Sequence, residues 1–384
     1  MKHFTLILVS IFVFLANVAN AITPAPPALG ADSFILMDYD SGQIIAESNA
    51  DNPLPPASLT KMMTSYVVSN ELAAGNIRLD DQVTVSENAW AKNFPESSKM
   101  FIEVGKQVSV SELLKGLIIS SGGDASVALA EHVAGSEDSF AQLMNMHARK
   151  LGMENTRFVN AHGLTAEGHQ TTARDMAMLA QAMIRDYPNE YELYKLKEFT
   201  YNNIRQYNRN QLLWDRSLDV DGIKTGHTDA AGYCLVSSAV KDGMRLIAVV
   251  MGTRSEEARK VESKKLLTYG FRFFETVKPL EANTEVHQAR VWGGEVEQAK
   301  LGVLDKTYLT IPRGKRSQVK ATYEVENELE APVAKGQIVG KIFFELDGED
   351  ISEVPLVALE DIPEGGWFSR LIDGIVRWFS ELFS

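Results

Sequence analysis

The sequence has little that would serve a nucleic-acid partner or a disulfide-bonded fold. Only one of its 384 residues, Cys234, is a cysteine, so no internal disulfide can form. The 38 lysines and arginines are outnumbered by 51 aspartates and glutamates, which gives a formal net charge of −13 at pH 7. Because no basic run is present either, we expect no nucleic-acid partner. Cys234 lies between Tyr233 and Leu235 in an apolar stretch and is predicted to be a buried small hydrophobe.

The motifs of two large hydrolase classes are missing as well. The sequence contains neither the Gly-x-Ser-x-Gly of a nucleophile elbow nor the His-Glu-x-x-His of zinc peptidases. His132 and His147 fall in stretches predicted to be helical, without a partner residue at metal-ligand spacing. We therefore expect no metal site, and the sequence implies no cofactor.

A long uncharged apolar run occurs at the N-terminus. Lys2 and His3 precede the run from Leu6 to Leu15, and Ala19-Asn20-Ala21 follows as a cleavage site of the A-x-A type. The run is too short, and too closely followed by this site, to span a membrane. Residues 1–21 are therefore predicted to be a signal peptide that directs the mature chain to an oxidising compartment.

The C-terminal segment has apolar residues at helical spacing, with charged and polar residues on the opposite side. Pro363, Gly365 and Gly366 precede it, and charge recurs in every turn, so it cannot cross a bilayer. It is predicted to be an amphipathic helix that lies in a membrane interface. The alternative is a terminal helix docked on the protein's own core. The apolar residues are Trp367, Phe368, Leu371, Ile372, Ile375, Val376, Trp378, Phe379, Leu382 and Phe383.

Between these ends the pattern predicts two domains. Residues 22–278 are expected to form an α+β domain, because stretches predicted to be strands lie at both ends of a helical region. Residues 279–361 alternate in hydrophobicity and predict a small all-β sandwich, and residues 362–384 form the amphipathic helix. The expected elements of the first domain are strands at 33–39, 44–47, 232–239 and 245–251, and helices at 58–72, 111–118, 124–133, 171–184 and 255–274.

A Ser-x-x-Lys motif occurs three times, and one copy has the context of a catalytic pair. Ser58 and Lys61 open a predicted helix, because Pro55 and Pro56 keep the chain extended before it and helical apolar spacing follows. A separation of three residues along a helix places both side chains on one face, where a lysine can act as base for a serine nucleophile. Taken alone, such a motif is more often a helix cap followed by a solvated lysine.

The context of the whole sequence favours the catalytic interpretation. The other two copies, Ser238-Ala-Val-Lys241 and Ser317-Gln-Val-Lys320, lie in stretches predicted to be strands, where positions i and i+3 point to opposite faces. A Lys-Thr-Gly occurs once, at Lys224-Thr225-Gly226. A Ser-x-x-Lys followed by a later Lys-Thr-Gly is typical of serine acyl-transfer sites that use lysine in place of histidine.

The third part of such a site is usually Ser-x-Asn, and here the sequence departs from that pattern. Ser86-Glu87-Asn88 matches it literally, but it starts a polar segment close behind the predicted nucleophile helix and is interpreted as a decoy. Ser121-Gly122-Gly123 lies where one apolar helix ends and another begins, a junction that can deliver a hydroxyl to a cleft. Gly123 then occupies the position of the carboxamide.

These motifs identify a family. Over its whole length the chain resembles the D-alanyl-D-alanine carboxypeptidases, low-molecular-mass penicillin-binding proteins of Gram-negative-type periplasm. The resemblance implies a β-lactamase-like catalytic domain, removal of the terminal D-alanine from peptidoglycan pentapeptides, acylation by penicillin, and anchoring to the outer face of the inner membrane. It rests on Ser58-x-x-Lys61, Ser121-Gly-Gly-Asp-Ala-Ser-Val-Ala-Leu-Ala, His162-Gly-Leu, Thr172-Ala-Arg-Asp-Met-Ala, Arg209, Lys224-Thr225-Gly226-His227-Thr228, the small β domain and the terminal helix.

The residues can be given roles in such a reaction. Ser58 would attack the carbonyl between the two D-alanines and form an ester, and Lys61, if neutral, would accept its proton. Burial and the nearby cation Lys224 are both expected to lower the pKa of Lys61. Ser121 would relay the proton to the departing amine. The backbone N–H groups of Ser58 and, as the resemblance implies, His227 would stabilise the oxyanion.

The remaining positions concern substrate binding. Lys224 and Thr225 are expected to bind the free carboxylate of the substrate, with Arg209 as a second cation. Gly226 would let the peptide approach closely. In the family the asparagine at position 123 bonds to the lysine and to the substrate amide, so Gly123 predicts a weaker or altered enzyme, and restoring the asparagine is expected to raise the acylation rate.

Two other functions remain open on the sequence. A β-lactamase shares the first two motifs, but the Glu-x-x-x-Asn loop of the enzymes closest in motif is not found between Leu151 and Ala173. A wall-binding scaffold that lost activity through Gly123 is the second alternative, and the intact Ser58, Lys61 and Lys224 argue against it.

Overall fold

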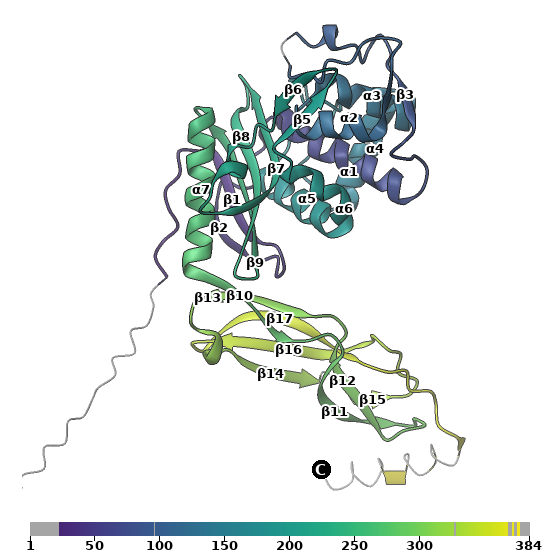
Figure 1. Cartoon of the computed structure of the whole chain (residues 1–384). Helices are drawn as coiled ribbons and strands as arrows, with labels where there is room; N and C mark the ends of the chain where they lie inside the picture. Colours follow the sequence, from purple (N-terminus) through teal and green to yellow (C-terminus); the bar gives the residue numbers. More distant parts are fainter. Residues whose placement is uncertain (1–22, 96, 326–327, 368–370, 372–374, 377–384) are drawn as a thin grey trace, which may run out of the picture.

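The computed structural model describes residues 23–95, 97–325, 328–367, 371 and 375–376 (Figure 1). The predicted signal peptide, residues 1–21, lies outside the described residues, as does most of the predicted C-terminal helix. The α+β layers and the separate β domain expected from the sequence are both present.

A five-stranded antiparallel sheet forms the centre of the first domain. Its order is β2-β1-β9-β8-β7, so β7 is an edge strand that pairs only with β8. Alternate side chains enter different cores: Ile35 and Met37 pack with the helical region, whereas Leu36 packs on the face covered by α7 (Figure 1). The strands are β1 (Ser33–Asp38), β2 (Ile44–Ser48), β7 (Asp219–Thr228), β8 (Gly232–Lys241) and β9 (Met244–Thr253), and α7 is Glu256–Phe273.

The helical region covers the other face of this sheet. Its central helix, α1 (Thr60–Ala73), is buried on all sides from Thr60 to Ser69, which explains why its apolar residues show only loose periodicity. The other helices are α2 (Val110–Ile118), α3 (Gly123–Ala134), α4 (Glu137–Lys150), α5 (Ala173–Asp186) and α6 (Pro188–Tyr191), with short 3₁₀ turns η1 (Ala57–Leu59), η2 (Ala91–Asn93), η3 (Glu192–Lys195) and η4 (Gln211–Trp214). Two small ribbons, β3 (Gln82–Thr84) with β4 (Gln107–Ser109) and β5 (Glu198–Tyr201) with β6 (Ile204–Tyr207), complete it.

The five expected helices each start one or two residues away from the expected position, and the starts of α2 and α3 have a local explanation. Helix α2 begins at Val110, because Ser109 and Glu112 form a reciprocal capping box one residue earlier than expected. Helix α3 has Gly122 at its N-cap, and Asp124, where the helix was expected to start, lies inside the first turn. The Asp124 carboxylate instead accepts hydrogen bonds from the backbone of the loop at residues 100–102.

The helices and strands described for the second domain are all strands, apart from one 3₁₀ turn. A six-stranded sheet of order β14-β16-β17-β12-β11-β15 shares a core with the ribbon β10-β13. Strand β10 follows α7 directly and already pairs with β13, so the expected boundary between residues 278 and 279 falls inside β10. The elements are β10 (Phe274–Leu280), β11 (Thr284–Trp292), β12 (Gln298–Val303), β13 (Thr307–Pro312), η5 (Arg316–Gln318), β14 (Lys320–Val325), β15 (Leu329–Glu330), β16 (Ile338–Leu346) and β17 (Glu349–Ala358).

The described residues of the C-terminal segment are helical and expose apolar side chains. Trp367 is 74% exposed, Leu371 53% and Ile375 50%, at a spacing of four residues. Within the part of the chain that the structure describes, no helix combines the length and the apolar character needed to cross a membrane.

Candidate active site

The nucleophile candidate lies in a strained turn ahead of the central helix. Ser58 is the middle residue of η1, and α1 begins only at Thr60, so Ser58 precedes the helix rather than opening it. Ala57 has a φ of 48°, a left-handed conformation that non-glycine residues adopt at a cost. The Ser58 hydroxyl caps neither η1 nor α1, so the helix-cap alternative is excluded.

Lys61, in the first turn of α1, points back at this hydroxyl. Its Nζ lies 3.2 Å from Ser58 Oγ and also donates to the backbone carbonyl of His162. The lysine is only 1% exposed. Burial lowers the pKa of the Lys61 amine to about 7, although the carboxylate of Asp124 opposes this shift. A large fraction of the amine is therefore neutral near pH 7 and able to take a proton.

A second lysine and serine face the same place from the opposite side. Ser121, in the loop between α2 and α3, has a φ of 58° and accepts a hydrogen bond of 2.8 Å from Lys224 Nζ on β7. Lys224 is 3% exposed and also donates to the Thr225 carbonyl at 3.2 Å. Burial and then the charge of Lys61 lower the pKa of Lys224 well below its ordinary value. The charge of Arg209 adds to the effect of burial on both lysines.

The two pairs meet at a cleft of about 800 Å³. Six of the eight residues expected from the sequence line it, namely Ser58, Ser121, Arg209, Thr225, Gly226 and His227. Lys61 and Lys224 are the other two, and they lie behind this wall, each held by the hydroxyl that it contacts. A carboxylate in the cleft would therefore meet Thr225 and the exposed Arg209 first.

Gly226 has a packing role that the sequence did not predict. A Cβ at this position would stand 3.1 Å from the Pro56 carbonyl oxygen and 3.3 Å from the Ala57 Cβ. The glycine thus lets β7 pack against the turn that carries Ser58, so its close neighbour is the nucleophile turn. Because β7 is an edge strand, its outer backbone groups also face away from β8, and an extended peptide can pair with them.

Asp124 is a structural member of the site that sequence reasoning missed. Its carboxylate accepts backbone hydrogen bonds from Met100 at 2.8 Å, Phe101 at 2.8 Å and Ile102 at 3.2 Å, and also from Ala125 at 2.9 Å. These bonds hold the loop that brings Ser97 and Ser98 to the cleft. No sequence spacing connects residue 124 with residues 100–102, so this contact could not be foreseen.

Arg259 on α7 was missed for the same reason. It is 4% exposed, lines the cleft, and its Nη1 donates to the Gly226 carbonyl at 3.3 Å. Its guanidinium lies over the ring of Tyr233, which stacks on His227 with ring centroids 3.9 Å apart. This stack holds the His227 ring against β8 at the end of β7.

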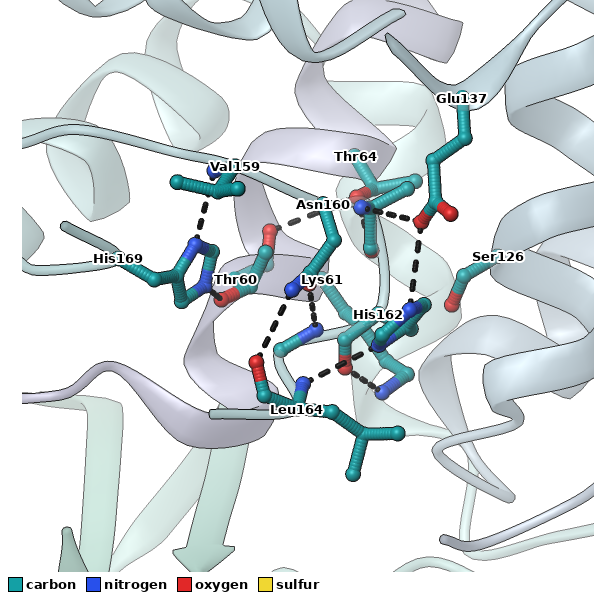
Figure 2. A network of polar contacts seen from close by, with 12 residues as sticks. Thr60, Lys61, Thr64, Ser126, Glu137, Val159, Asn160, His162, Leu164 and His169 are labelled. Atoms are coloured by element: carbon teal, nitrogen blue, oxygen red, sulfur yellow. Dashed lines mark hydrogen bonds and ion pairs between the residues drawn. The ribbon is translucent and has the colours of Figure 1, made fainter. Parts of the chain in front are cut away.

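The histidines behind the nucleophile belong to one polar network (Figure 2). His162 lines the cleft, and its backbone carbonyl accepts from Lys61. His169 does not line the cleft: it is 6% exposed and its Nε2 lies 2.8 Å from Thr60 Oγ1. Burial lowers the pKa of His162 to about 3 and that of His169 to about 4, so both rings are neutral at pH 7.

The other Ser-x-x-Lys and Ser-x-Asn matches lie away from the cleft lining. Ser238 and Lys241 both belong to strand β8, as expected. Ser317 lies in the turn η5 and not in a strand, so that part of the expectation was wrong. Ser86 and Asn88 hydrogen-bond to the two carboxylate oxygens of Glu131, which confirms that this match is structural.

Cys234, which the sequence assigned to the interior, is fully buried in β8. Burial raises the pKa of its thiol to about 11, so it is not a reactive thiolate at neutral pH.

Comparison with known proteins places this site in a family. The D-alanyl-D-alanine carboxypeptidase family profile matches residues 20–255, and that of the penicillin-binding protein 5 C-terminal domain matches residues 274–364. The chain is 53% identical to the D-alanyl-D-alanine carboxypeptidase DacA of Escherichia coli over 368 residues, which cover 95% of this chain and 91% of that protein.

Solved structures agree with the sequence matches. Penicillin-binding protein 5 from Haemophilus influenzae superposes with a TM-score of 0.87 at 50% identity, covering 89% of this chain and 100% of that chain. Penicillin-binding protein D2 from Listeria monocytogenes, solved in its ampicillin-bound form, superposes with a TM-score of 0.59 at 28% identity over 65% of this chain and 100% of that one. The chain therefore belongs to the D-alanyl-D-alanine carboxypeptidase family and is an enzyme of that activity, a hydrolase.

Proposed function

We propose that the enzyme removes the terminal D-alanine of a peptidoglycan pentapeptide through an ester formed on Ser58. The observation that carries this proposal is the buried Lys61 amine, 3.2 Å from the Ser58 hydroxyl and with its pKa lowered to about 7. A base for serine must be within hydrogen-bond reach and must be neutral, and this lysine meets both conditions.

The acylation step moves one proton and exchanges one bond. Ser58 Oγ attacks the carbonyl carbon between the two D-alanines, and Lys61 takes the hydroxyl proton. The carbon–nitrogen bond then breaks, and the leaving amine receives a proton through Ser121, whose hydroxyl lies 2.8 Å from Lys224 Nζ. Water subsequently adds to the ester: its hydroxyl group goes to the acyl carbon, its proton goes to Ser58 Oγ, and the shortened peptide is released.

The backbone of β7 supplies the binding surface. The N–H groups of Ser58 and His227 stabilise the oxyanion, and loss of one such donor typically costs about 10²–10³ in rate. Thr225 and Arg209, which line the cleft, bind the terminal carboxylate, and the buried amine of Lys224 lies behind them. The rest of the peptide pairs with the free edge of β7.

The same site should accept β-lactams, because their strained amide presents a carbonyl and a carboxylate in the same relation. The Listeria relative in its ampicillin-bound form supports this. The test uses fluorescent penicillin with the mature wild-type chain, Ser58→Ala, and Ser86→Ala as a control serine outside the cleft. Wild type and Ser86→Ala should be labelled stoichiometrically and Ser58→Ala not at all. Labelling of Ser58→Ala at the wild-type rate would overturn the assignment.

D-Alanine release from a pentapeptide distinguishes this function from its alternatives. A carboxypeptidase releases D-alanine catalytically, whereas a β-lactamase releases little and turns over penicillin quickly. A scaffold without activity would do neither. The 53% identity to the D-alanyl-D-alanine carboxypeptidase DacA favours the first outcome.

We also propose that the enzyme works in the periplasm, attached to the outer face of the inner membrane by residues 367–383. The exposure of Trp367, Leu371 and Ile375 on one side of the helical segment supports a lipid contact over docking on the protein's own core. The formal charge of this segment is near zero, so apolar insertion should dominate.

Sedimentation with phosphatidylcholine vesicles tests the attachment. The mature chain should co-sediment at low and at high salt, whereas a chain ending at Asp361 and a Leu371→Asp variant should stay in the supernatant. Equal binding of the shortened chain would contradict the proposal.

For the domains, we propose that residues 22–273 form the catalytic unit and 274–361 the β domain, because β10 pairs with β13.

A further inference from the structure

The turn that receives the Lys61 hydrogen bond is held between two helices. On the side of α1, Thr64 Oγ1 donates to the Ala161 carbonyl at 2.7 Å, and Lys61 donates to the His162 carbonyl. The backbone of Gly163 packs so closely on the nucleophile turn that a Cβ there would stand 2.0 Å from the Ala57 carbonyl oxygen. The position of this turn therefore decides where the Lys61 amine points.

On the other side, helix α4 holds the turn through Glu137. Glu137 Oε1 accepts from the Ala161 backbone N–H at 2.8 Å and lies 3.4 Å from His162 Nε2 (Figure 2). His162 Nδ1 accepts from the Leu164 N–H at 3.1 Å, so the neutral ring carries its proton on Nε2, facing the carboxylate. Oε1 of Glu137 thus contacts both the backbone N–H of Ala161 and the side chain of His162. The carbonyl that accepts from Lys61 belongs to His162.

We propose that Glu137 is a positioning residue for Lys61: through Ala161 and His162 it fixes the carbonyl that aims the amine at Ser58, and it places a carboxylate near that amine. This proposal rests on the proposed role of Lys61 as proton acceptor. Glu137 does not line the cleft, so it acts through the turn and through its charge, without touching the substrate.

The charges around Lys61 define the expected effect. Asp124 and Glu137 favour its protonated form, and Arg209 opposes it. Lys224 is the other neighbouring amine, and it is buried with a strongly lowered pKa. The rings of His162 and His169 face Lys61 as well but are neutral at pH 7.

Two opposing influences act on Glu137 itself. Burial raises the pKa of its carboxyl, as do Asp138 and Glu131, whereas the Ala161 N–H and Lys61 lower it. Removing the charge of Glu137 leaves Asp124 as the anion that favours the Lys61 ammonium, so the lysine should lose its proton at lower pH.

Two substitutions separate the positioning from the charge. Glu137→Gln keeps an Oε1 that can accept from both Ala161 and His162, because no contact in the structure requires a charge on Oε2. Glu137→Ala removes the acceptor as well. Asp138→Asn is the matched control, since it removes one negative charge from the same turn of α4 at an exposed position.

The measurement is the rate of acylation of the mature chain by fluorescent penicillin between pH 5 and 9, with a melting curve for each variant. For Glu137→Gln the acidic limb should move to lower pH by about half a unit or more, with a plateau within about threefold of wild type. Glu137→Ala should show a similar shift and a plateau lower by about tenfold, because the carbonyl is no longer fixed. Asp138→Asn should follow wild type.

The failures of the two proposals are distinguishable. If Lys61→Met is acylated at the wild-type rate, Lys61 is not the proton acceptor and both proposals fall. If wild type shows the acidic limb and Lys61→Met is inactive, but Glu137→Gln superposes on wild type, only the role of Glu137 is overturned. A shift as large in Asp138→Asn as in Glu137→Gln would also overturn it, because any charge near α4 would then suffice.

Discussion

The ring of Phe94 fills the place where the side chain of residue 123 would begin. A Cβ on Gly123 would stand 2.9 Å from Phe94 Cδ1 and 3.1 Å from Ser97 Oγ. Phe94 is 5% exposed and packs edge-on against the ring of His162, with centroids 5.8 Å apart. The glycine and the phenylalanine therefore form one packing unit beside the active-site serines.

This packing revises what Gly123→Asn should do. The sequence alone led us to expect faster acylation, but an asparagine must displace a buried ring, and overpacking of this kind costs about 1–3 kcal/mol. We expect Gly123→Asn to lower the melting temperature and to leave acylation by penicillin no faster than in wild type. Acylation that rises in the single variant would show that Phe94 moves aside easily.

The double variant Gly123→Asn with Phe94→Ala provides the control. Removing the ring opens the space that the amide needs, so the double variant should be acylated faster than Phe94→Ala alone. Stopped-flow acylation of all four proteins, including wild type, forms a double-mutant cycle. Additive effects at the two positions would contradict the packing argument.

Acylation should fall as the pH drops through 7. The neutral Lys61 amine is the proposed base, and burial lowers its pKa to about 7. Below that pH the ammonium form dominates, so the rate should decrease by about tenfold per pH unit. The pH profile of the acylation rate checks this, and a rate that stays flat down to pH 5 would exclude Lys61 as the base.

The same lysine should reduce the stability of the protein. In the unfolded chain its amine has the ordinary pKa of 10.5, whereas in the folded protein it binds a proton only below about 7. Between pH 7 and 10.5 the unfolded state therefore binds one more proton than the folded state. The destabilisation that Lys61 causes is greatest below pH 7 and diminishes as the pH rises toward 10.5. Lys61→Met should thus unfold at a higher denaturant concentration than wild type at pH 7. The difference in the free energy of unfolding between the two proteins should narrow as the pH rises, by at most about 1.4 kcal/mol per pH unit.

Local spacing was enough to find the reacting groups. Ser58 and Lys61 are three residues apart, so their contact follows from the start of one helix, and Lys224 lies on a strand that the Lys-Thr-Gly motif marks. Apolar periodicity also located four strands of the central sheet and the helices α1, α2, α3, α5 and α7, because each of these elements alternates or repeats on its own scale. It gave neither strand β7 nor helix α4.

The supporting groups could not be found in this way. Glu137 and Ala161 are 24 residues apart, and Asp124 and Met100 are also 24 residues apart, on segments whose meeting depends on the packing of the whole helical region. The side chains of Glu137 and Asp124 bind backbone N–H groups, which every residue except proline carries, so the partner cannot be recognised from the sequence. The effect of Gly226 on the nucleophile turn was hidden for the same reason, because it concerns backbone against backbone.

Asp124→Ala should destabilise the protein and weaken substrate binding together. The substitution leaves the buried N–H groups of Met100, Phe101 and Ile102 without their acceptor, and unsatisfied buried groups cost about 1–3 kcal/mol each. The loop that carries Ser97 and Ser98 should then loosen. We expect a melting temperature lower by several degrees and a raised KM for D-alanine release. Asp124→Asn keeps one acceptor oxygen and should lose less on both measures. An unchanged KM in a stable Asp124→Ala variant would show that the loop does not contribute to binding.

Two glycine substitutions should separate catalysis from folding. In Gly226→Ala the new methyl group meets the Pro56 carbonyl at 3.1 Å, so β7 must move away from the nucleophile turn by a few tenths of an ångström. A shift of this size loosens the oxyanion position relative to Ser58, and kcat should fall by about tenfold or more while the melting temperature changes little. In Gly163→Ala the methyl group would stand 2.0 Å from the Ala57 carbonyl oxygen at a φ of 86°, so that variant should fail to fold stably. Kinetics of D-alanine release and melting curves for both variants test the distinction. If Gly226→Ala instead has a clearly lower melting temperature but keeps the kcat of wild type, the contact between β7 and the turn serves stability alone.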